Sequence, residues 1–181
     1  MADPQPKGQT STHRGAFGDL GGEERGFIDR SFRERIILVG VDNQSDKNQL
    51  IEAQMAELQQ LVATAGADVV SSVIQKKTIP DSATYIGRGK AIEIFALAEE
   101  LDVDTVVFNE ELTPAQQFNL EKIFKRSAID RTAVILDIFA QNASTPEGKS
   151  QVELAQLQYL LPRLRGRGGT LSQQAGGIGT R

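Results

Sequence analysis

Cysteine is absent from this chain of 181 residues, and histidine occurs only once, as His13. Without cysteine the chain forms no disulfide, no thiolate zinc site and no cysteine nucleophile, which suits a reducing compartment. Because His13 lies in a polar, glycine-rich stretch, a histidine-based triad and a multi-histidine metal site are excluded as well. We therefore expect no catalytic residue of these classes and no metal site.

Long apolar runs are also missing. No stretch approaches the length that a helix needs to span a bilayer, and the N-terminus has no apolar signal-peptide core. Hydrophobic residues make up 39% of the chain and charged residues 24%, as in a typical globular protein. We expect a cytoplasmic protein without a membrane span. Its net charge of -4 means that any contact with nucleic acid is local, and no DNA partner is expected.

Positive charge is concentrated in the last 22 residues. Residues 160–181 hold four arginines, six glycines and no acidic residue, so they contribute +4 and leave -8 on residues 1–159. Arginine matches phosphate geometry, and glycine lets the backbone approach RNA closely. The alternative is a solvated C-terminal tail, and charge alone leaves the two interpretations equal.

The first 131 residues divide into a tail and a folded region. Residues 1–33 have no apolar periodicity and are predicted to be a disordered tail. Short apolar runs predict strands at 36–41, 67–75, 105–109 and 127–129, with amphipathic helices between them. This alternation predicts an α/β domain over residues 34–131, with a parallel sheet of about four strands flanked by helices. Gly66 is expected to end one helix, and Thr113 followed by Pro114 to begin another.

Residues 132–181 are predicted to form a long helical arm with a Gly/Arg-rich tip. The apolar segment 132–143 could be a strand or a buried helix, and we favour a helix capped by Asp130 or Thr132. Asp130 and Arg131 are candidates for a local ion pair at the junction. Within this helix Asp137 and Phe139 are expected to be structural, with the Phe139 ring buried. A second helix, half of a helical hairpin, is expected to follow a new start and to end at the tip.

Two short segments resemble anion-binding loops. Residues 143–150 nearly match the phosphate-binding pattern G-x-x-x-x-G-K-[ST], but the Thr145-Pro146-Glu147 sequence also reads as a helix start, which we favour. The other segment, expected between a short strand and a helix, is a candidate anion or nucleotide contact. It consists of Gly87, Arg88, Gly89 and Lys90. A tight turn with solvated basic side chains is the favoured alternative there.

Several motifs occur together in an order that is specific to one family. They are Tyr85-Ile86-Gly87-Arg88-Gly89-Lys90, Asp130-Arg131-Thr132, Ile135-Leu136-Asp137-Ile138-Phe139-Ala140, Gln151-Val152-Glu153-Leu154-Ala155-Gln156-Leu157 and Gly176-Gly177-Ile178-Gly179. From about residue 35 to residue 181 the chain resembles the HflX family of ribosome-associated GTPases. The resemblance does not extend to residues 1–33.

This resemblance implies a function for the arm. It implies the ribosome-binding N-terminal region of a GTPase that associates with the large ribosomal subunit and acts in ribosome splitting and rescue. The GTPase domain would begin beyond residue 181, so GTP and Mg²⁺ are implied for the full-length family member and no cofactor for residues 1–181. That GTPase domain and the large-subunit rRNA are the implied partners.

The residues of the arm tip are then the candidate rRNA contacts. They are Arg163, Arg165, Arg167, Gly168, Gly169, Gln174, Gly176, Gly177, Gly179 and Arg181. The alternative function is an autonomous α/β domain that binds ATP or GTP and has a regulatory role. The resemblance implies GTP hydrolysis for the full-length family member, but the GTPase motifs are not among these residues, so we expect the chain alone to be inactive.

Overall fold

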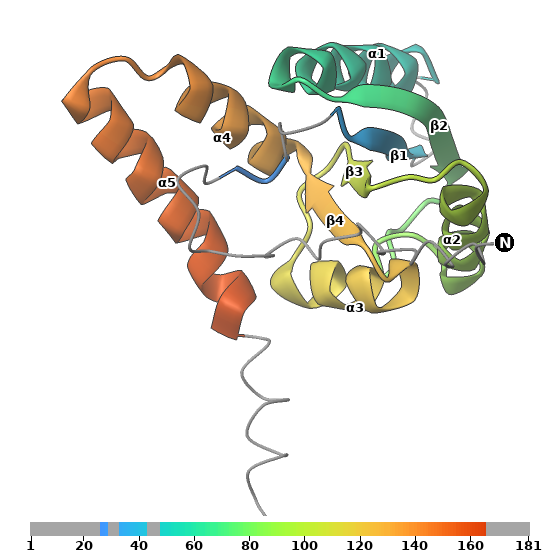
Figure 1. The fold of residues 1–181 in the computed structure, drawn as a ribbon. Helices are drawn as coiled ribbons and strands as arrows, with labels where there is room; N and C mark the ends of the chain where they lie inside the picture. The colour runs from blue at the N-terminus through green and yellow to red at the C-terminus, as the bar shows by residue number, and fades with distance from the viewer. Residues whose placement is uncertain (1–25, 29–32, 43–47, 166–181) are drawn as a thin grey trace, which may run out of the picture.

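The structure is a computed structural model that describes residues 26–28, 33–42 and 48–165. Its strands and helices alternate up to the fourth strand, after which two helices follow in succession (Figure 1). The elements are β1 (Arg35–Asp42), α1 (Asn48–Ala65), β2 (Asp68–Lys76), α2 (Arg88–Glu100), β3 (Thr105–Phe108), α3 (Pro114–Phe124), β4 (Ser127–Asp130), α4 (Arg131–Asn142) and α5 (Pro146–Arg165).

The four strands form one parallel sheet in the order β2-β1-β3-β4, which confirms the predicted fold class. β1 lies inside the sheet and is buried from Ile36 to Asp42, which explains its nearly continuous apolar sequence. Since consecutive side chains of a strand point to opposite faces, the residues of β1 supply two separate cores. Ile37 and Val39 pack on one face, and Ile36 and Leu38 pack on the other.

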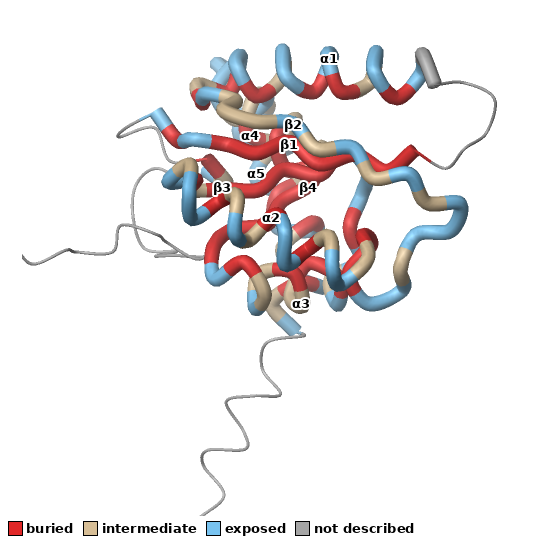
Figure 2. Tube along the Cα trace, turned by 90° about the vertical axis from the view of Figure 1, so that its right-hand side faces the viewer, coloured by how far each residue is buried: buried red, intermediate tan, exposed pale blue. Residues whose placement is uncertain are grey.

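The helices form a layer on each face of this sheet. α2 and α3 cover the face that contains Phe108, with Ile94 and Phe124 fully or almost fully buried against it. α1 and α4 cover the opposite face, where Leu58 and Val134 are completely buried. Figure 2 shows the buried strands between helices whose outer sides are exposed. The result is the three-layer arrangement expected of an α/β fold.

Helix ends lie where the sequence places them. Thr113 caps α3 in a reciprocal capping box with Gln116, and Pro114 occupies the first turn. Gly66 follows α1 with φ of +99°, a conformation that favours glycine. The expected short strand before Gly87 is absent from the described part of the chain, because Tyr85 forms only one isolated bridge with Asp81.

The apolar segment 132–143, for which a strand and a buried helix were both considered, is helical as far as Asn142 and belongs to α4. Asp130 caps α4 by accepting a hydrogen bond from Ala133 N–H. α5 begins at Pro146, and Thr145 Oγ1 accepts a hydrogen bond from Gly148 N–H. Residues 143–150 therefore form a capped helix start, as expected, rather than a phosphate-binding loop. α5 has 20 residues, so it is about 30 Å long.

Two expectations about burial are wrong. Phe139 lies on the outer side of α4 and is 57% exposed, whereas Val134 and Asp137 of the same helix are buried. Residues 26–28, placed in the disordered tail, instead join the fold, and Ile28 is 2% exposed in the core beneath α4. The remainder of the tail, residues 1–25 and 29–32, lies outside the described residues.

Candidate functional site

The candidate RNA-binding residues fall into three groups in the structure. Arg165 is exposed at the last described position of α5. Arg163 lies one half-turn earlier and is buried. The others lie outside the described residues, namely Arg167, Gly168, Gly169, Gln174, Gly176, Gly177, Gly179 and Arg181.

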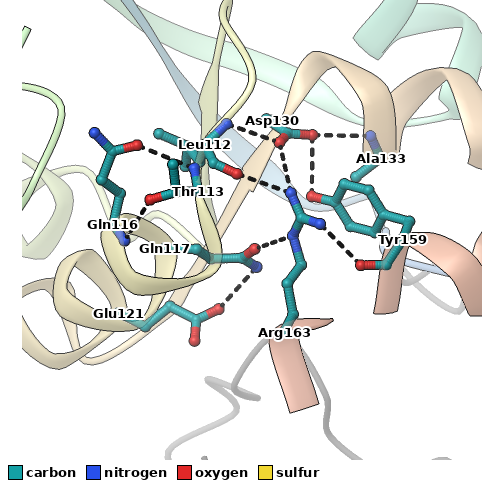
Figure 3. A network of polar contacts seen from close by, with 9 residues as sticks. All are labelled: Leu112, Thr113, Gln116, Gln117, Glu121, Asp130, Ala133, Tyr159 and Arg163. Atoms are coloured by element: carbon teal, nitrogen blue, oxygen red, sulfur yellow. Dashed lines mark hydrogen bonds and ion pairs between the residues drawn. The ribbon is translucent and has the colours of Figure 1, made fainter. Parts of the chain in front are cut away.

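Arg163 is engaged by protein acceptors on all of its guanidinium nitrogens (Figure 3). Its Nε donates to Gln117 Oε1 at 2.8 Å, and its Nη1 donates to the Tyr159 carbonyl oxygen at 2.8 Å. Its Nη2 donates to the Leu112 carbonyl oxygen at 2.8 Å and lies 3.3 Å from Asp130 Oδ2. The prediction that Arg163 binds an rRNA phosphate is therefore wrong, because its donors are directed into the protein.

Asp130 is the centre of this network and is fully buried at the end of β4. One carboxylate oxygen accepts from Ala133 N–H at 3.1 Å and from the Tyr159 hydroxyl at 3.0 Å. The other accepts from Leu112 N–H at 3.0 Å in addition to Arg163. One carboxylate thus connects the loop before α3, the first turn of α4 and the far half of α5.

The expected partner of Asp130 was its neighbour Arg131, and this part of the prediction is wrong. Arg131 forms an ion pair with Glu57 of α1 instead. The junction between body and arm is nevertheless held by Asp130, through a residue 33 positions later in the chain. A neighbour in sequence could not serve here, because Arg131 lies in the first turn of α4 and points toward α1.

Tyr159 completes the junction from the α5 side. The Arg163 guanidinium carbon lies 3.5 Å from the centre of the Tyr159 ring, a cation–π contact. Phe27 meets the same ring edge-on, with centroids 5.2 Å apart and planes at 83°. Burial and the nearby Asp130 carboxylate raise the pKa of the Tyr159 hydroxyl above its usual value. The hydroxyl therefore stays protonated and donates to Asp130.

The second candidate segment lies at the start of α2, on the side of the body away from α5 (Figure 1). Gly87 is the N-cap and provides no side-chain cap, while its N–H donates to Gln75 Oε1 at 3.0 Å. Lys90 is paired with Glu93 at 2.7 Å. Arg88 and Gly89 are exposed in the first turn. The structure therefore brings the four residues to one helix end, with the charge of Lys90 already balanced.

Sequence reasoning missed the residues that hold the arm. Gln117, Tyr159 and Phe27 are far apart in the chain, and none belongs to a recognisable motif. The available signal was spacing, since Tyr159 and Arg163 are four positions, about one turn, apart in α5. That spacing places both on one side of the helix.

Over residues 26–28, 33–42 and 48–165 there is no group of three or more histidine, aspartate or glutamate side chains that could hold a metal ion. None of the helices in these ranges is long and apolar enough to cross a membrane.

Comparison with known proteins relates the chain to one group of GTPases. Residues 52–140 match the family described as GTP-binding GTPase N-terminal, and residues 142–181 match the GTP-binding GTPase Middle Region. GTPase HflX of Alkalihalophilus pseudofirmus is 50% identical over 149 residues, which cover 82% of this chain and 35% of that protein. GTPase HflX of Escherichia coli is 42% identical over 149 residues, which cover 82% of this chain and 34% of that protein. The chain thus spans about a third of the length of these relatives.

A solved structure shares the fold. It is a crystal structure of a GTP-binding protein from the hyperthermophilic archaeon Sulfolobus solfataricus in complex with GDP. The TM-score is 0.55 at 27% identity, over 75% of this chain and 40% of that one.

Proposed function

The chain belongs to the HflX family of GTPases, and from this premise we propose that it acts as the ribosome-binding region of such a protein. In this proposal it associates with the large ribosomal subunit in the cytoplasm and contributes to ribosome splitting and rescue. Residues 34–131 form the α/β body, and residues 132–181 form the arm and tip that contact rRNA.

The observation that carries this proposal is the junction at Asp130. Its buried contacts with Tyr159 and Arg163 fix α5 against the body, so that the exposed Arg165 lies at the end of a firmly attached helix. Residues 160–181 carry +4 while the rest of the chain carries -8. RNA phosphates would attract that end and repel the body.

Because Arg163 is buried in the junction, we do not count it among the proposed phosphate contacts. Arg163 serves to hold the arm, and Arg165, Arg167 and Arg181 are the phosphate contacts that we propose. The glycines and Gln174 of residues 168–179 would let the backbone follow the RNA surface and donate to it. Arg163 then affects binding only through the direction of α5.

The GTP and Mg²⁺ of the family are not assigned to residues described here. The only near-match to a phosphate-binding loop, residues 143–150, does not fit a nucleotide, because Gly148 N–H is directed to Thr145 Oγ1 within the helix cap. Pro146 also lacks the N–H that a phosphate cradle would use. We therefore attribute no step of GTP hydrolysis to this part of the chain.

The start of α2 is proposed as a minor contact. Arg88 and Gly89 are exposed at a helix start, a position that suits an anion. The Gly87 N–H already donates to Gln75, and Lys90 is already paired with Glu93. Only the charge of Arg88 is therefore available to a phosphate there.

The test is co-sedimentation of the 181-residue chain with purified large subunits over a series of salt concentrations. We expect binding that weakens as salt rises, because phosphate contacts release counterions. Purified small subunits and bare DNA, added at the same phosphate concentration as the large subunits, serve as controls. Equal binding to all three, or no binding to the large subunit at low salt, would contradict the proposal.

A further inference from the structure

Residues 26–28 cross the angle between α4 and α5 and contact both helices. The N–H groups of Phe27 and Ile28 donate to the two carboxylate oxygens of Asp137 in α4, at 2.9 and 2.7 Å. Asp137 is completely buried, and it lies 110 and 109 positions after these two donors. Two short hydrogen bonds, one to each oxygen of the Asp137 carboxyl group, set both the position and the direction of the segment.

The side chains of the same segment extend this attachment. Ile28 is 2% exposed and packs in the core that includes Ile36, Val134 and Tyr159. The Phe27 ring packs against the Tyr159 ring of α5 in a T-shaped arrangement. A Cβ atom on Gly26 would lie 3.1 Å from the Ile28 carbonyl oxygen, so this position favours glycine. The segment therefore binds α4 through its backbone and α5 through an aromatic ring.

α5 is attached to the rest of the protein by a small set of buried side chains, together with the partly buried Leu160. Its buried residues are Gln156, Tyr159 and Arg163, and Leu154, Leu157 and Leu161 on its outer side are about half exposed. Two of the three buried residues meet the Asp130 network, and one of those two, Tyr159, also meets Phe27. Tyr159 is thus held both by its hydroxyl, which donates to Asp130, and by its ring contact with Phe27.

We propose that residues 26–28 act as a clamp that sets the direction of α5 relative to the sheet, with Phe27, Asp137 and Tyr159 as positioning residues. Release of the clamp would leave the sheet and its helices folded and free α5 to reorient about the short connection between α4 and α5. The clamp itself is independent of any ligand. Its effect on the ribosome rests on the proposed function, because only there does the direction of the tip matter.

The absence of cysteine allows a direct measurement of that direction. Spin labels at Gln59→Cys on α1 and Gln158→Cys on α5, both exposed, report the distance between body and arm. A second pair, Gln59→Cys and Glu100→Cys, lies within the body and reports whether the sheet and its helices remain folded. Pulsed electron resonance then gives a distance distribution for each pair.

We expect one narrow peak from the body–arm pair in the parent chain. Phe27→Ala and Asp137→Asn should broaden or shift this peak, while the body pair stays unchanged. Arg33→Ala is the matched control, because Arg33 belongs to the same N-terminal region but pairs with the exposed Asp68. Deletion of residues 1–25 should preserve the narrow peak, and deletion of residues 1–28 should remove it.

Two results would overturn the clamp. One is an unchanged body–arm peak in Phe27→Ala and in the 1–28 deletion. The other is a body pair that broadens together with the body–arm pair, which would make the segment a general part of the core. Large-subunit co-sedimentation of Phe27→Ala separates the two proposals. A broadened peak with unchanged binding would establish the clamp and count against the arm as the ribosome contact.

Discussion

Arg163 and Asp130 meet in the interior of the protein, with Nη2 3.3 Å from Oδ2, although 33 positions separate them in the chain. Their side chains are 6% and 0% exposed. Burial of two charges is costly unless the remaining donors and acceptors are satisfied, and here Gln117, Leu112 and Tyr159 provide those partners. The pair therefore joins the end of the sheet to the far half of α5.

Removal of one partner of this pair should be strongly destabilising. Arg163→Ala leaves the Asp130 carboxylate buried without its counter-charge, which typically costs about 3–5 kcal/mol of unfolding free energy. Urea unfolding followed by far-ultraviolet circular dichroism measures the loss. Arg165→Ala is the matched control, since Arg165 is exposed on the same helix and should change stability by less than about 0.5 kcal/mol. Equal losses in the two variants would contradict the assignment of Arg163 to the junction.

The different burial of Arg163 and Arg165 could not be predicted from the sequence. The alternating arginines at 163, 165 and 167 suggest one basic surface, but residues two positions apart on a helix do not share a face. Of the two described arginines, Arg163 faces the body and is buried, whereas Arg165 is exposed. The acceptors of Arg163 come from the loop before α3, from α3, from β4 and from α5, and no local pattern indicates that they converge.

Other elements could be predicted because their causes are local. Continuous apolar runs placed the strands, and Thr113, Pro114 and Gly66 marked helix ends through their own backbone preferences. The attachment of residues 26–28 to Asp137 could not be predicted in this way. It uses backbone N–H groups, which every residue except proline has, so the sequence of the tail carries no sign of it.

Phe139 and Phe124 should respond very differently to the same substitution. Phe139 is 57% exposed, so Phe139→Ala should change the unfolding free energy by less than about 0.5 kcal/mol. Phe124 is completely buried against the sheet, and Phe124→Ala should cost about 3–5 kcal/mol. Chemical unfolding of both variants tests this. A large loss in Phe139→Ala would mean that its ring is covered in solution.

The two tyrosines should resist ionisation as long as the protein is folded. Burial raises the pKa of both hydroxyls, with nearby Glu110 adding to the effect at Tyr85 and Asp130 at Tyr159. In unfolded chains tyrosine titrates at about pH 10. A raised pKa in the folded state means that this contribution to stability is complete below about pH 10 and is lost as pH rises further.

Tyrosinate absorbance measures this directly, because the chain has only two tyrosines and no tryptophan. We expect no tyrosinate at about pH 10 in the native protein and normal titration in denaturant, where both hydroxyls are solvated. Tyr159→Phe identifies the contribution of Tyr159. Half-ionised tyrosine at about pH 10 with native circular dichroism would show that the hydroxyls are accessible.

Residues 143–150 should contribute nothing to nucleotide chemistry. Lys149 lies in the first turn of α5, and the Gly148 N–H is taken by the cap. We expect the 181-residue chain to hydrolyse no GTP and Lys149→Ala to behave like the parent chain. Phosphate release in the presence of Mg²⁺ measures the activity. Turnover that disappears in Lys149→Ala would overturn the helix-start interpretation.

The tip should account for most of the salt dependence of large-subunit binding. Arg165→Ala combined with Arg167→Ala removes two proposed phosphate contacts, and each should lower the salt slope by roughly 0.7–0.9. Stability should stay nearly unchanged, because the exposed Arg165 takes no part in the Asp130 network.

The pair Arg88→Ala and Lys90→Ala removes the same charge from the start of α2. Because Lys90 is paired with Glu93, this double variant should lower the salt slope by no more than the amount expected for about one phosphate contact. Co-sedimentation over a salt series compares the two double variants. If the Arg88 and Lys90 variant loses the larger slope, the principal rRNA contact lies on the α/β body and not at the tip of the arm.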